Sequence, residues 1–293
     1  MSEGPEKVYT AFYAYSATRG GVCTLRRGAR AARGCAGRRV CGRAFESELR
    51  GGPVDEVLVL SKHASASKVP ALTLHAIGVP GETPHGERAR SGGIKGKAVP
   101  PSTRFGDMFR TMRKIAIEAS LDKEYDITLE ATHHGPLLNT PTLYLEIGSD
   151  EARWSDSRAA RVWAQTISVC LGMSEDTQQR EWLGEGDVMI GLGGGHYAPR
   201  HKAIISETEV WVGHILANYA IVFEGQEESS SPLGPWEHSV RTAVDSTRAA
   251  FPGGHVFAHL DRKSFKGWQR QALSSLLSEL DVPVRRGKDI LLP

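Results

Sequence analysis

The side chains best suited to chemistry follow a run of glycines in residues 191–201. The stretch reads Gly-Leu-Gly-Gly-Gly-His-Tyr-Ala-Pro-Arg-His, and the residues before it, 187–190, predict a short buried strand. Consecutive glycines expose backbone N–H groups and carry no β-carbon that would keep a substrate away. A tight bend would explain the glycines alone, but it would not require His196 and Arg200. We therefore expect this loop to line a reactive or anion-binding site.

Histidines and carboxylates also stand at the ends of other predicted strands. Because ligands of α/β sheets collect at the carboxyl ends of strands, we expect these side chains to converge. Imidazole and carboxylate groups are Zn²⁺ ligands, and neutral imidazole transfers protons near neutral pH. The spacing matches no His-Glu-x-x-His helix and no Cys/His finger, and for a single histidine such as His214 a structural role is favoured. The set comprises His63, His75, His133, His134, His196, His201, His214, Glu130 and Glu146.

The sequence offers no convincing covalent nucleophile. No Gly-x-Ser-x-Gly elbow is present, and Cys170 lies on the apolar stripe of a predicted helix. The glycine loop fits neither a Walker A nor a Gly-x-Gly-x-x-Gly pattern, because His, Tyr and Pro follow at once. Activated water is therefore the expected nucleophile, with backbone N–H groups of Gly194 and Gly195 stabilising an oxyanion.

Basic side chains near the loop are candidates for holding phosphates. Arg200 and Lys202 follow the glycines directly, and Lys263 and Lys266 begin the predicted C-terminal helix. An ordinary solvated surface would explain them equally well. With Tyr197 they form the predicted substrate-binding set.

The elements that position these residues alternate between strands and helices. Apolar alternation predicts strands at 54–61, 72–75, 125–131, 142–148, 187–190 and 289–292. Helical spacing predicts helices at 105–119, from a cap at Ser155 or Asp156 through Cys170, and at 265–280. Such alternation is typical of a three-layer α/β domain, a mixed sheet flanked by helices.

Composition limits the class of protein. The 293 residues are 40% hydrophobic and 24% charged, and the formal net charge of +2 gives no global argument for nucleic-acid binding. No apolar run approaches the ~20 residues that span a bilayer, and the N-terminus has no signal-peptide pattern. Four cysteines without a Cys-x-x-Cys pair indicate neither a disulfide scaffold nor a zinc ribbon. We expect a cytoplasmic protein without membrane contact.

Three regions are predicted along the chain. Residues 1–18 form an N-terminal strand region, 19–50 an arginine- and glycine-rich insertion, and 51–293 a single α/β domain. The insertion lacks apolar periodicity and is expected to be disordered; a nucleic-acid-binding arm or a displaced targeting signal is the alternative. Loops are predicted at 81–102 and 227–232.

Two motifs give the chain a resemblance to a known family. Thr-His-His-Gly-Pro at 132–136 and Gly-Gly-Gly-His-Tyr-Ala-Pro at 193–199 occur in this order in archaeal- and plant-type D-aminoacyl-tRNA deacylases. Further similar pieces extend the resemblance over residues 54–290. They are Leu-Ser-Lys-His at 60–63, Leu-Thr-Leu-His at 72–75, Leu-Glu-Ile-Gly-Ser at 145–149, Trp-Ser-Asp at 154–156, Gly-His-Ile at 213–215 and Asp-Arg-Lys at 261–263.

The resemblance implies a fold similar to peptidyl-tRNA hydrolase and nucleoside phosphorylase. It implies hydrolysis of the ester between a D-amino acid and the 3′-terminal adenosine of tRNA, including aldehyde-modified D-aminoacyl-tRNA, with Zn²⁺ as cofactor. The partner would be the 3′ acceptor end of charged tRNA, bound by a monomer or homodimer.

The residues and the resemblance together give the expected site. His133, His134 and His196, with Glu130, are the catalytic candidates, and His63, His75 and Glu146 join the three histidines as candidate metal ligands. A catalytically impaired tRNA- or nucleotide-binding homologue is the alternative, because the arginine-rich segment stands where the family begins with a strand. A small-molecule metallohydrolase is a third hypothesis.

Overall fold

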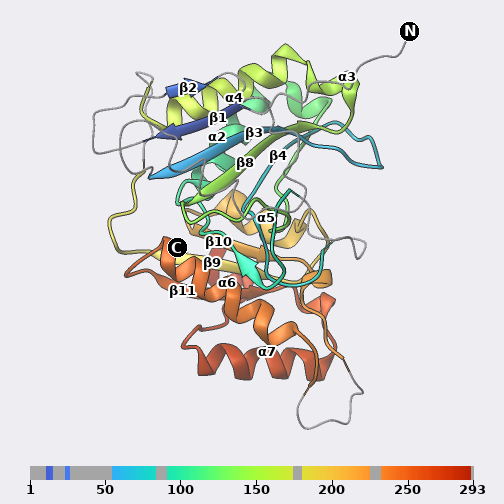
Figure 1. Ribbon diagram of the computed structural model, residues 1–293, viewed down its shortest axis with the longest axis vertical. Helices are drawn as coiled ribbons and strands as arrows, with labels where there is room; N and C mark the ends of the chain where they lie inside the picture. The colour runs from blue at the N-terminus through green and yellow to red at the C-terminus, as the bar shows by residue number, and fades with distance from the viewer. Residues whose placement is uncertain are drawn as a thin grey trace.

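The computed structural model describes residues 11–15, 24–26, 55–83, 91–173, 180–224 and 232–291. Two main sheets lie one above the other in Figure 1, with helices packed on both (Figure 1). The larger has the strand order β2-β1-β3-β8-β4-β7, the smaller β10-β9-β11, and β5 pairs with β6. The strands are β1 Ala11–Tyr15, β2 Thr24–Arg26, β3 Glu56–Lys62, β4 Ala71–His75, β5 Gly78–Val79, β6 Lys97–Ala98, β7 Asp126–Ile127, β8 Thr142–Gly148, β9 Asp187–Leu192, β10 Trp211–Leu216 and β11 His255–Leu260.

The helices lie between these strands in the chain. In the described residues they are α2 Phe105–Glu118, α3 Glu151–Trp154, α4 Ser157–Cys170, α5 Pro199–Glu207, α6 Trp236–Ala250, α7 Gly267–Glu279 and α8 Gly287–Leu291, with short 3₁₀ turns η3 Leu121–Lys123, η4 Asn218–Ala220 and η5 Arg262–Ser264. None of these described helices has the length and apolar character needed to cross a bilayer.

The larger sheet is mixed. β3 and β8 run parallel, and β4 lies antiparallel to β8. Helices α2 and α4 pack together against the sheet through a core that includes Phe109 and Trp163. The helix α4 begins where its cap predicts, because the Asp156 side chain accepts a hydrogen bond from the Arg158 backbone N–H.

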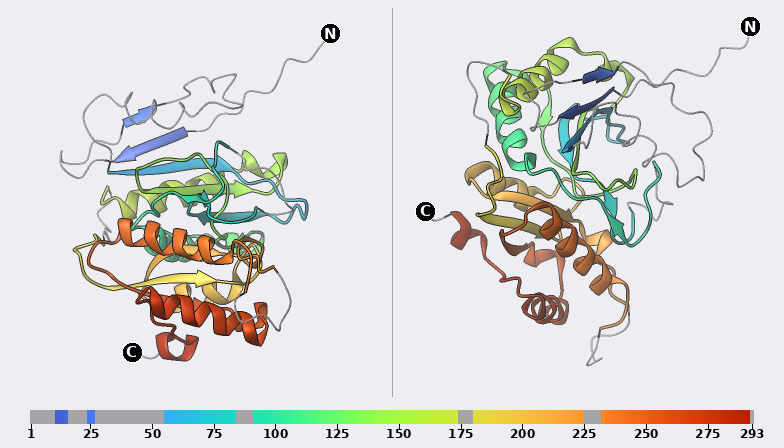
Figure 2. Two further views of the ribbon diagram at one scale, coloured as in Figure 1. Left: turned by 60° about the horizontal axis from the view of Figure 1, so that its bottom comes forward. Right: turned by 60° about the vertical axis from the view of Figure 1, so that its left-hand side comes forward.

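The smaller sheet is parallel and covered on both faces. Val188 and Ile190 of β9 face the core formed with α6 and α7, whereas Met189 faces the core shared with α2 and α5. This double burial explains the continuous apolar character of the strand. Figure 2 shows α6 and α7 packed beside this sheet. Because parallel strands end at one edge, the residues that follow β9, β10 and β11 lie beside one another.

A short extended segment joins the two sheets. The backbone N–H groups of Thr128 and Glu130 donate to Leu72 and Leu74 of β4 (2.9 and 3.1 Å). The next two backbone N–H groups donate to the other part of the molecule. The Ala131 N–H donates to the His196 carbonyl in the loop after β9, and the Thr132 N–H donates to the Ile215 carbonyl of β10 (both 2.7 Å). Glu130 is therefore held by the backbone of both sheets.

Most predicted elements are confirmed, with three corrections. The strand predicted at 125–131 is regular only over β7: Thr128 and Glu130 still donate to β4, but the Ala131 N–H donates to His196 of the glycine loop instead. The strand predicted at 289–292 is wrong, since residues 287–291 form α8, and three apolar residues are too few to distinguish the two states. The loop predicted at 81–102 contains β6.

Parts of the sequence prediction lie outside the described residues. Of the arginine-rich segment only β2 is described, as a strand antiparallel to β1. Residues 225–231, which hold most of the predicted acidic loop, and 84–90 are not among the described residues either.

Candidate active site

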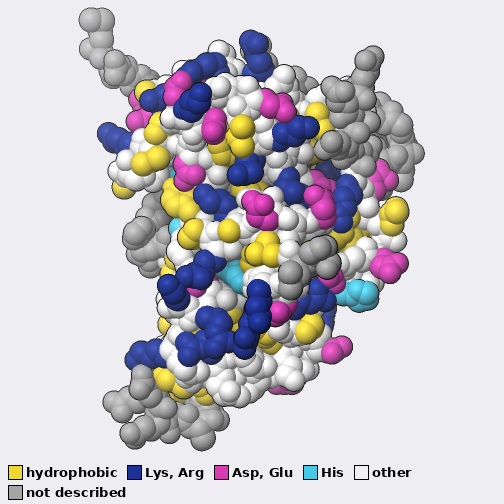
Figure 3. All heavy atoms as spheres, turned by 180° about the vertical axis from the view of Figure 1, so that it is seen from behind, with side chains coloured by type: hydrophobic (Ala, Val, Ile, Leu, Met, Phe, Trp, Pro, Cys, Tyr) yellow, Lys and Arg dark blue, Asp and Glu magenta, His cyan; other side chains and the backbone are white. Residues whose placement is uncertain are grey.

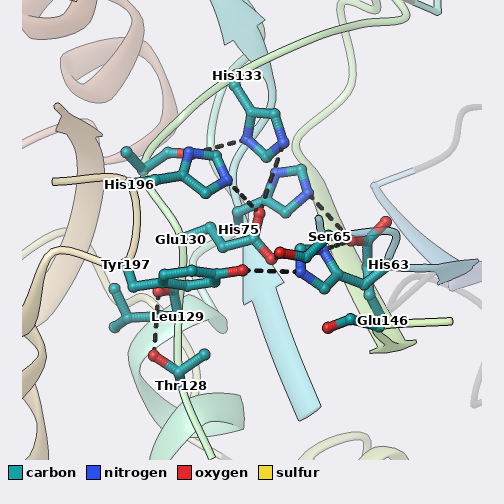
Figure 4. A network of polar contacts seen from close by, with 12 residues as sticks. His63, Ser65, His75, Thr128, Leu129, Glu130, His133, Glu146, His196 and Tyr197 are labelled. Carbon is teal, nitrogen blue, oxygen red and sulfur yellow. Dashed lines mark hydrogen bonds and ion pairs between the residues drawn. The ribbon is translucent and has the colours of Figure 1, made fainter. Parts of the chain in front are cut away.

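Most of the predicted histidines and carboxylates converge around Glu130, at the junction of the two sheets (Figure 4). The Glu130 side chain is fully buried. Its Oε2 lies 2.8 Å from His196 Nε2 and 3.6 Å from His133 Nε2, and its Oε1 lies 3.2 Å from His63 Nδ1. A carboxylate at the centre of three imidazoles organises the site.

The larger sheet supplies a second carboxylate and two histidines. Glu146 on β8 has its Oε2 3.4 Å from His63 Nδ1 and 3.9 Å from His75 Nε2. The backbone carbonyl of His63 accepts a hydrogen bond from Trp154 Nε1 (2.8 Å), which fixes the end of β3. His75 ends β4, one strand away.

Three histidines share one orientation. Nδ1 of His75 contacts Ala76 O at 3.0 Å, Nδ1 of His133 contacts Ala131 O at 2.9 Å, and Nδ1 of His134 contacts Gly135 O at 2.6 Å. A carbonyl only accepts, so each Nδ1 carries the proton and each Nε2 keeps a lone pair.

This arrangement fits a metal ion. One ligand atom from each of His75, His133 and His134 lies within 4.8 Å of the others. The buried His75 Nε2 has no hydrogen-bond partner among the described residues, and buried polar atoms are rarely left so. Metal-bound histidines usually donate their other ring N–H to a carboxylate, a backbone carbonyl or water, as these three donate to carbonyls. Two further sets of possible ligands share Glu130: Glu130 with His133 and His196, and Glu130 with His63 and Glu146.

Burial and neighbouring charges keep the groups in the required protonation states. Burial lowers the pKa of His133 well below its usual value and that of His134 to about 4, and the positive charges of neighbouring imidazoles add to both effects. These imidazoles are therefore neutral near pH 7, as ligands must be. Burial alone would raise the pKa of Glu130, but the hydrogen bond from His196 and the surrounding histidines lower it, so Glu130 is a carboxylate.

His63 has a different electrostatic setting. Burial alone would lower its pKa, but a hydrogen bond to Glu146 and the negative charge of Glu130 outweigh it, and the pKa of His63 is raised. The other ring nitrogen, Nε2, lies 3.0 Å from the Tyr197 hydroxyl.

The glycine loop borders the histidine cluster through His196, which contacts Glu130. Gly193 and Gly194 have φ of +92° and +88°, which favours glycine, and a β-carbon on Gly193 would lie 2.6 Å from the Phe265 ring. The Gly194 N–H donates to Ser264 Oγ (2.7 Å), so it is already engaged. A β-carbon on Gly195 would meet nothing within 4 Å, and no hydrogen bond of its N–H is found among the described residues. Gly195 is the open position of the loop.

His196 is fixed from both sides. Its Nε2 contacts Glu130, and its Nδ1 lies 3.0 Å from the Tyr219 hydroxyl. Burial raises the pKa of Tyr219, so this hydroxyl keeps its proton and donates it to Nδ1. Tyr219 and Ser264 were missed by the sequence analysis, although both follow the ends of the parallel strands, where site residues are expected.

The predicted basic residues are more dispersed. Arg200 Nε pairs with Asp261 Oδ1 (3.0 Å), and Lys202 Nζ donates to Thr128 Oγ1 (3.0 Å). Lys263 and Lys266 are exposed on η5 and at the start of α7, and no described contact joins them to the histidine cluster.

Two further histidines of the set lie outside the cluster. His201 is buried against His259, with their Nδ1 atoms 2.9 Å apart. His214 lies between Thr132 Oγ1 and Ser246 Oγ (2.9 and 3.1 Å). The structural role favoured for His214 agrees with this burial.

Comparison with known proteins decides the family. A model of the family described as D-aminoacyl-tRNA deacylase matches residues 51–285, which include every residue of the cluster. The chain belongs to the D-aminoacyl-tRNA deacylase family. The resemblance carried by the two histidine motifs is thereby confirmed, and residues 1–50 lie outside the matched region.

The relatives of this deacylase-family chain are both plant and archaeal. It is 43% identical over 251 residues to the D-aminoacyl-tRNA deacylase of Arabidopsis thaliana, covering 83% of this chain and 79% of that protein. To the D-aminoacyl-tRNA deacylase of Methanosarcina mazei it is 34% identical over 244 residues, covering 83% and 71%. The crystal structure of AF0625, described as a conserved protein of unknown function, superposes with a TM-score of 0.66 at 25% identity, covering 85% and 77%. The mixed α/β fold flanked by helices is confirmed.

Proposed function

We propose that the chain hydrolyses the ester of D-aminoacyl-tRNA, releasing the free D-amino acid and tRNA. Family membership supports the reaction, and the single observation that carries the site assignment is the position of Glu130. Its Oε2 is bound to His196, whereas its buried Oε1 makes no hydrogen bond among the described residues and lies at ion-pair distance, 3.2 Å, from His63 Nδ1. A carboxylate oxygen with free hydrogen-bonding capacity beside His63 and the buried histidines is suited to hold a reacting water.

Zinc fits the donor set. His75, His133 and His134 would hold it through their Nε2 atoms, because three neutral histidines are a common catalytic zinc set. Bound zinc would supply Lewis acidity, polarising the ester carbonyl and making water more acidic.

The chain's own residues account for the proton movements. Glu130 Oε1 accepts a hydrogen bond from the attacking water and takes its proton as the water oxygen bonds to the ester carbonyl carbon. The same proton passes to the leaving ribose oxygen when the ester C–O bond breaks. His196 holds the Glu130 carboxylate in place through Oε2, and Tyr219 fixes the His196 ring.

The glycine loop would stabilise the charge that forms on the carbonyl oxygen. The backbone N–H of Gly195 is the candidate donor, because the N–H of Gly194 is already engaged by Ser264. The absence of a β-carbon at Gly195 leaves room for the ester beside His196.

The remaining predicted residues would hold the tRNA end. Tyr197 lies between His196 and His63 and is placed to contact the terminal adenosine or amino acid. Arg200, Lys202, Lys263 and Lys266 would bind acceptor-stem phosphates, which requires a phosphate to replace Asp261 at Arg200. We place this reaction in the cytoplasm, where charged tRNA is used, and extend it to aldehyde-modified D-aminoacyl-tRNA.

Deacylation of D-Tyr-tRNA compared with L-Tyr-tRNA tests the function. We expect release of D-tyrosine from the D-form and little hydrolysis of the L-form, in protein supplied with zinc. Equal rates on both substrates would contradict the proposal. Tight binding of tRNA without any hydrolysis would favour the impaired binding homologue instead.

The variant His196→Ala tests the site separately. Loss of the His196–Glu130 contact is expected to lower the rate by about 100-fold or more, with the fold retained because His196 is partly exposed. Full activity of this variant would remove the site assignment while leaving the activity itself standing.

A further inference from the structure

A cavity separate from the histidine cluster lies beside the end of β11. Its volume is about 580 Å³, and it lies between α5, the end of β11, α7 and α8. Its lining includes four arginines and one histidine, and none of the candidate metal ligands. They are Arg200, Arg262, Arg285, Arg286 and His259.

The charges of this arginine-lined cavity are not fully balanced. Arg200 pairs with Asp261, and Arg285 binds Asp187 through both terminal nitrogens while its guanidinium lies over the Phe257 ring. In the part of the chain that the structure describes, the guanidinium groups of Arg262 and Arg286 have no carboxylate partner, and both side chains are exposed. The cavity therefore carries positive charge that an anion would neutralise.

The histidine adds an acceptor beside this charge. His201 Nε2 donates to Gly193 O (3.2 Å), so His201 Nδ1 carries the lone pair and accepts from His259 Nδ1–H (2.9 Å). This order leaves His259 Nε2 as an unprotonated acceptor without a partner among the described residues. A β-carbon on Gly287, which also lines the cavity, would lie 3.8 Å from it.

One ligand class combines these two requirements. A phosphodiester oxygen suits the arginines but has no proton to donate, whereas the acceptor on His259 needs a neighbouring hydroxyl. An RNA strand presents both, a phosphate and a ribose 2′-hydroxyl on the same nucleotide step. DNA would supply the phosphate alone.

We propose that the arginine-lined cavity binds the RNA backbone of the tRNA substrate, with Arg262 and Arg286 on a phosphodiester and His259 Nε2 accepting from a ribose 2′-hydroxyl. This inference rests on the proposed function. Arg262 of the cavity lies on η5, whose Ser264 accepts from the Gly194 N–H of the glycine loop (2.7 Å), and on this basis the proposal has one tRNA reaching both the cavity and the active site. Figure 3 shows a group of Lys and Arg side chains on the lower half of the rear face, over the smaller sheet and its helices.

Binding of uncharged tRNA at several salt concentrations tests the arginines. The double variant Arg262→Gln/Arg286→Gln is compared with Arg113→Gln/Arg161→Gln, which removes the same charge from exposed positions on α2 and α4. The first is expected to weaken binding roughly tenfold and to reduce the salt slope by about 1, because one phosphate contact is lost. An equal effect of both double variants would overturn the proposal.

A second measurement tests the histidine. The ligands are an RNA hairpin with the acceptor-stem sequence and the same hairpin fully 2′-O-methylated, which keeps the helix form and removes the hydroxyl donor. The protein is expected to prefer the unmodified hairpin, and His259→Phe, checked for folding by its thermal transition, is expected to bind both alike. Equal binding of both hairpins by the unaltered protein would remove the role of His259.

The remaining outcomes distinguish this proposal from a small-anion site and from the proposed function. AMP or inorganic phosphate binding that depends on Arg262 and Arg286, with unchanged tRNA affinity, would make the cavity a small-anion site and overturn the inference. Deacylation plays no part in these assays. A protein that binds tRNA as expected but hydrolyses no ester would contradict the proposed function alone.

Discussion

At the scale of single residues, hydrogen-bonded tautomers determine what the histidines do. Their positions at strand ends predicted that His75, His133 and His134 would come together, but not that each would bind a backbone carbonyl through Nδ1 and leave Nε2 unprotonated. That orientation depends on three backbone carbonyls, at Ala76, Ala131 and Gly135, whose directions follow from the folded chain. The contact of Tyr219 with His196 could not be predicted from the sequence either, because it joins the turns that follow two different strands of the smaller sheet.

The proposed metal set predicts a specific loss of zinc. His75→Ala removes one of the three proposed Nε2 ligands, and zinc affinity is expected to fall by more than about 100-fold, since even outer-shell partners of zinc histidines contribute roughly 10–100-fold. Metal content after dialysis against a weak chelator measures it. His255→Ala, an exposed histidine at the start of β11, is the control and should retain zinc. Equal zinc in both variants would contradict the ligand assignment.

At the scale of elements, apolar periodicity predicted the helices and strands that are specified within one continuous segment of the chain. α2, α4 and β8 are confirmed because their apolar spacing alone specifies the buried face. The end of the predicted strand at 125–131 was not predictable, because Ala131 donates to His196, a partner in the loop that follows β9. The acidic centre of the site sits in that segment.

The glycine loop predicts opposite results for two neighbouring substitutions. Gly193→Ala places a β-carbon against Phe265 at a positive φ and is expected to destabilise the fold by about 2–4 kcal/mol. Gly195→Ala meets no neighbour and should unfold like the unaltered protein, yet lower kcat/KM for deacylation roughly tenfold by blocking the ester. Urea unfolding and initial rates measure both. A fully active Gly195→Ala would show that substrate does not approach this position.

At the scale of the whole molecule, one core unites the two sheets. Leu74 and Leu145 of the larger sheet share it with Met189 and Phe257 of the smaller. The reactive groups lie where the sheets meet, so neither sheet holds the cluster alone. Sequence patterns predicted the α/β class, but contacts between strands more than 50 residues apart in the chain are set only by packing.

Buried neutral histidines make this core sensitive to acid. Burial lowers the pKa of His214 to about 4, whereas in the unfolded chain it titrates near 6.5. The unfolded state therefore binds more protons below pH 6.5, and the free energy of unfolding falls as the pH drops toward 4. At pH 5 this one histidine is expected to contribute a loss of about 2 kcal/mol.

Urea unfolding between pH 7.5 and 5, in the presence of a chelator, measures this effect. His214→Asn is expected to be less stable at pH 7.5, because its contacts with Thr132 and Ser246 change, but to show a shallower fall of stability with acid. The chelator keeps metal binding from altering the comparison, so the difference in slope belongs to His214. Parallel slopes for the two proteins would mean that His214 accepts a proton in the folded state as readily as in the unfolded chain.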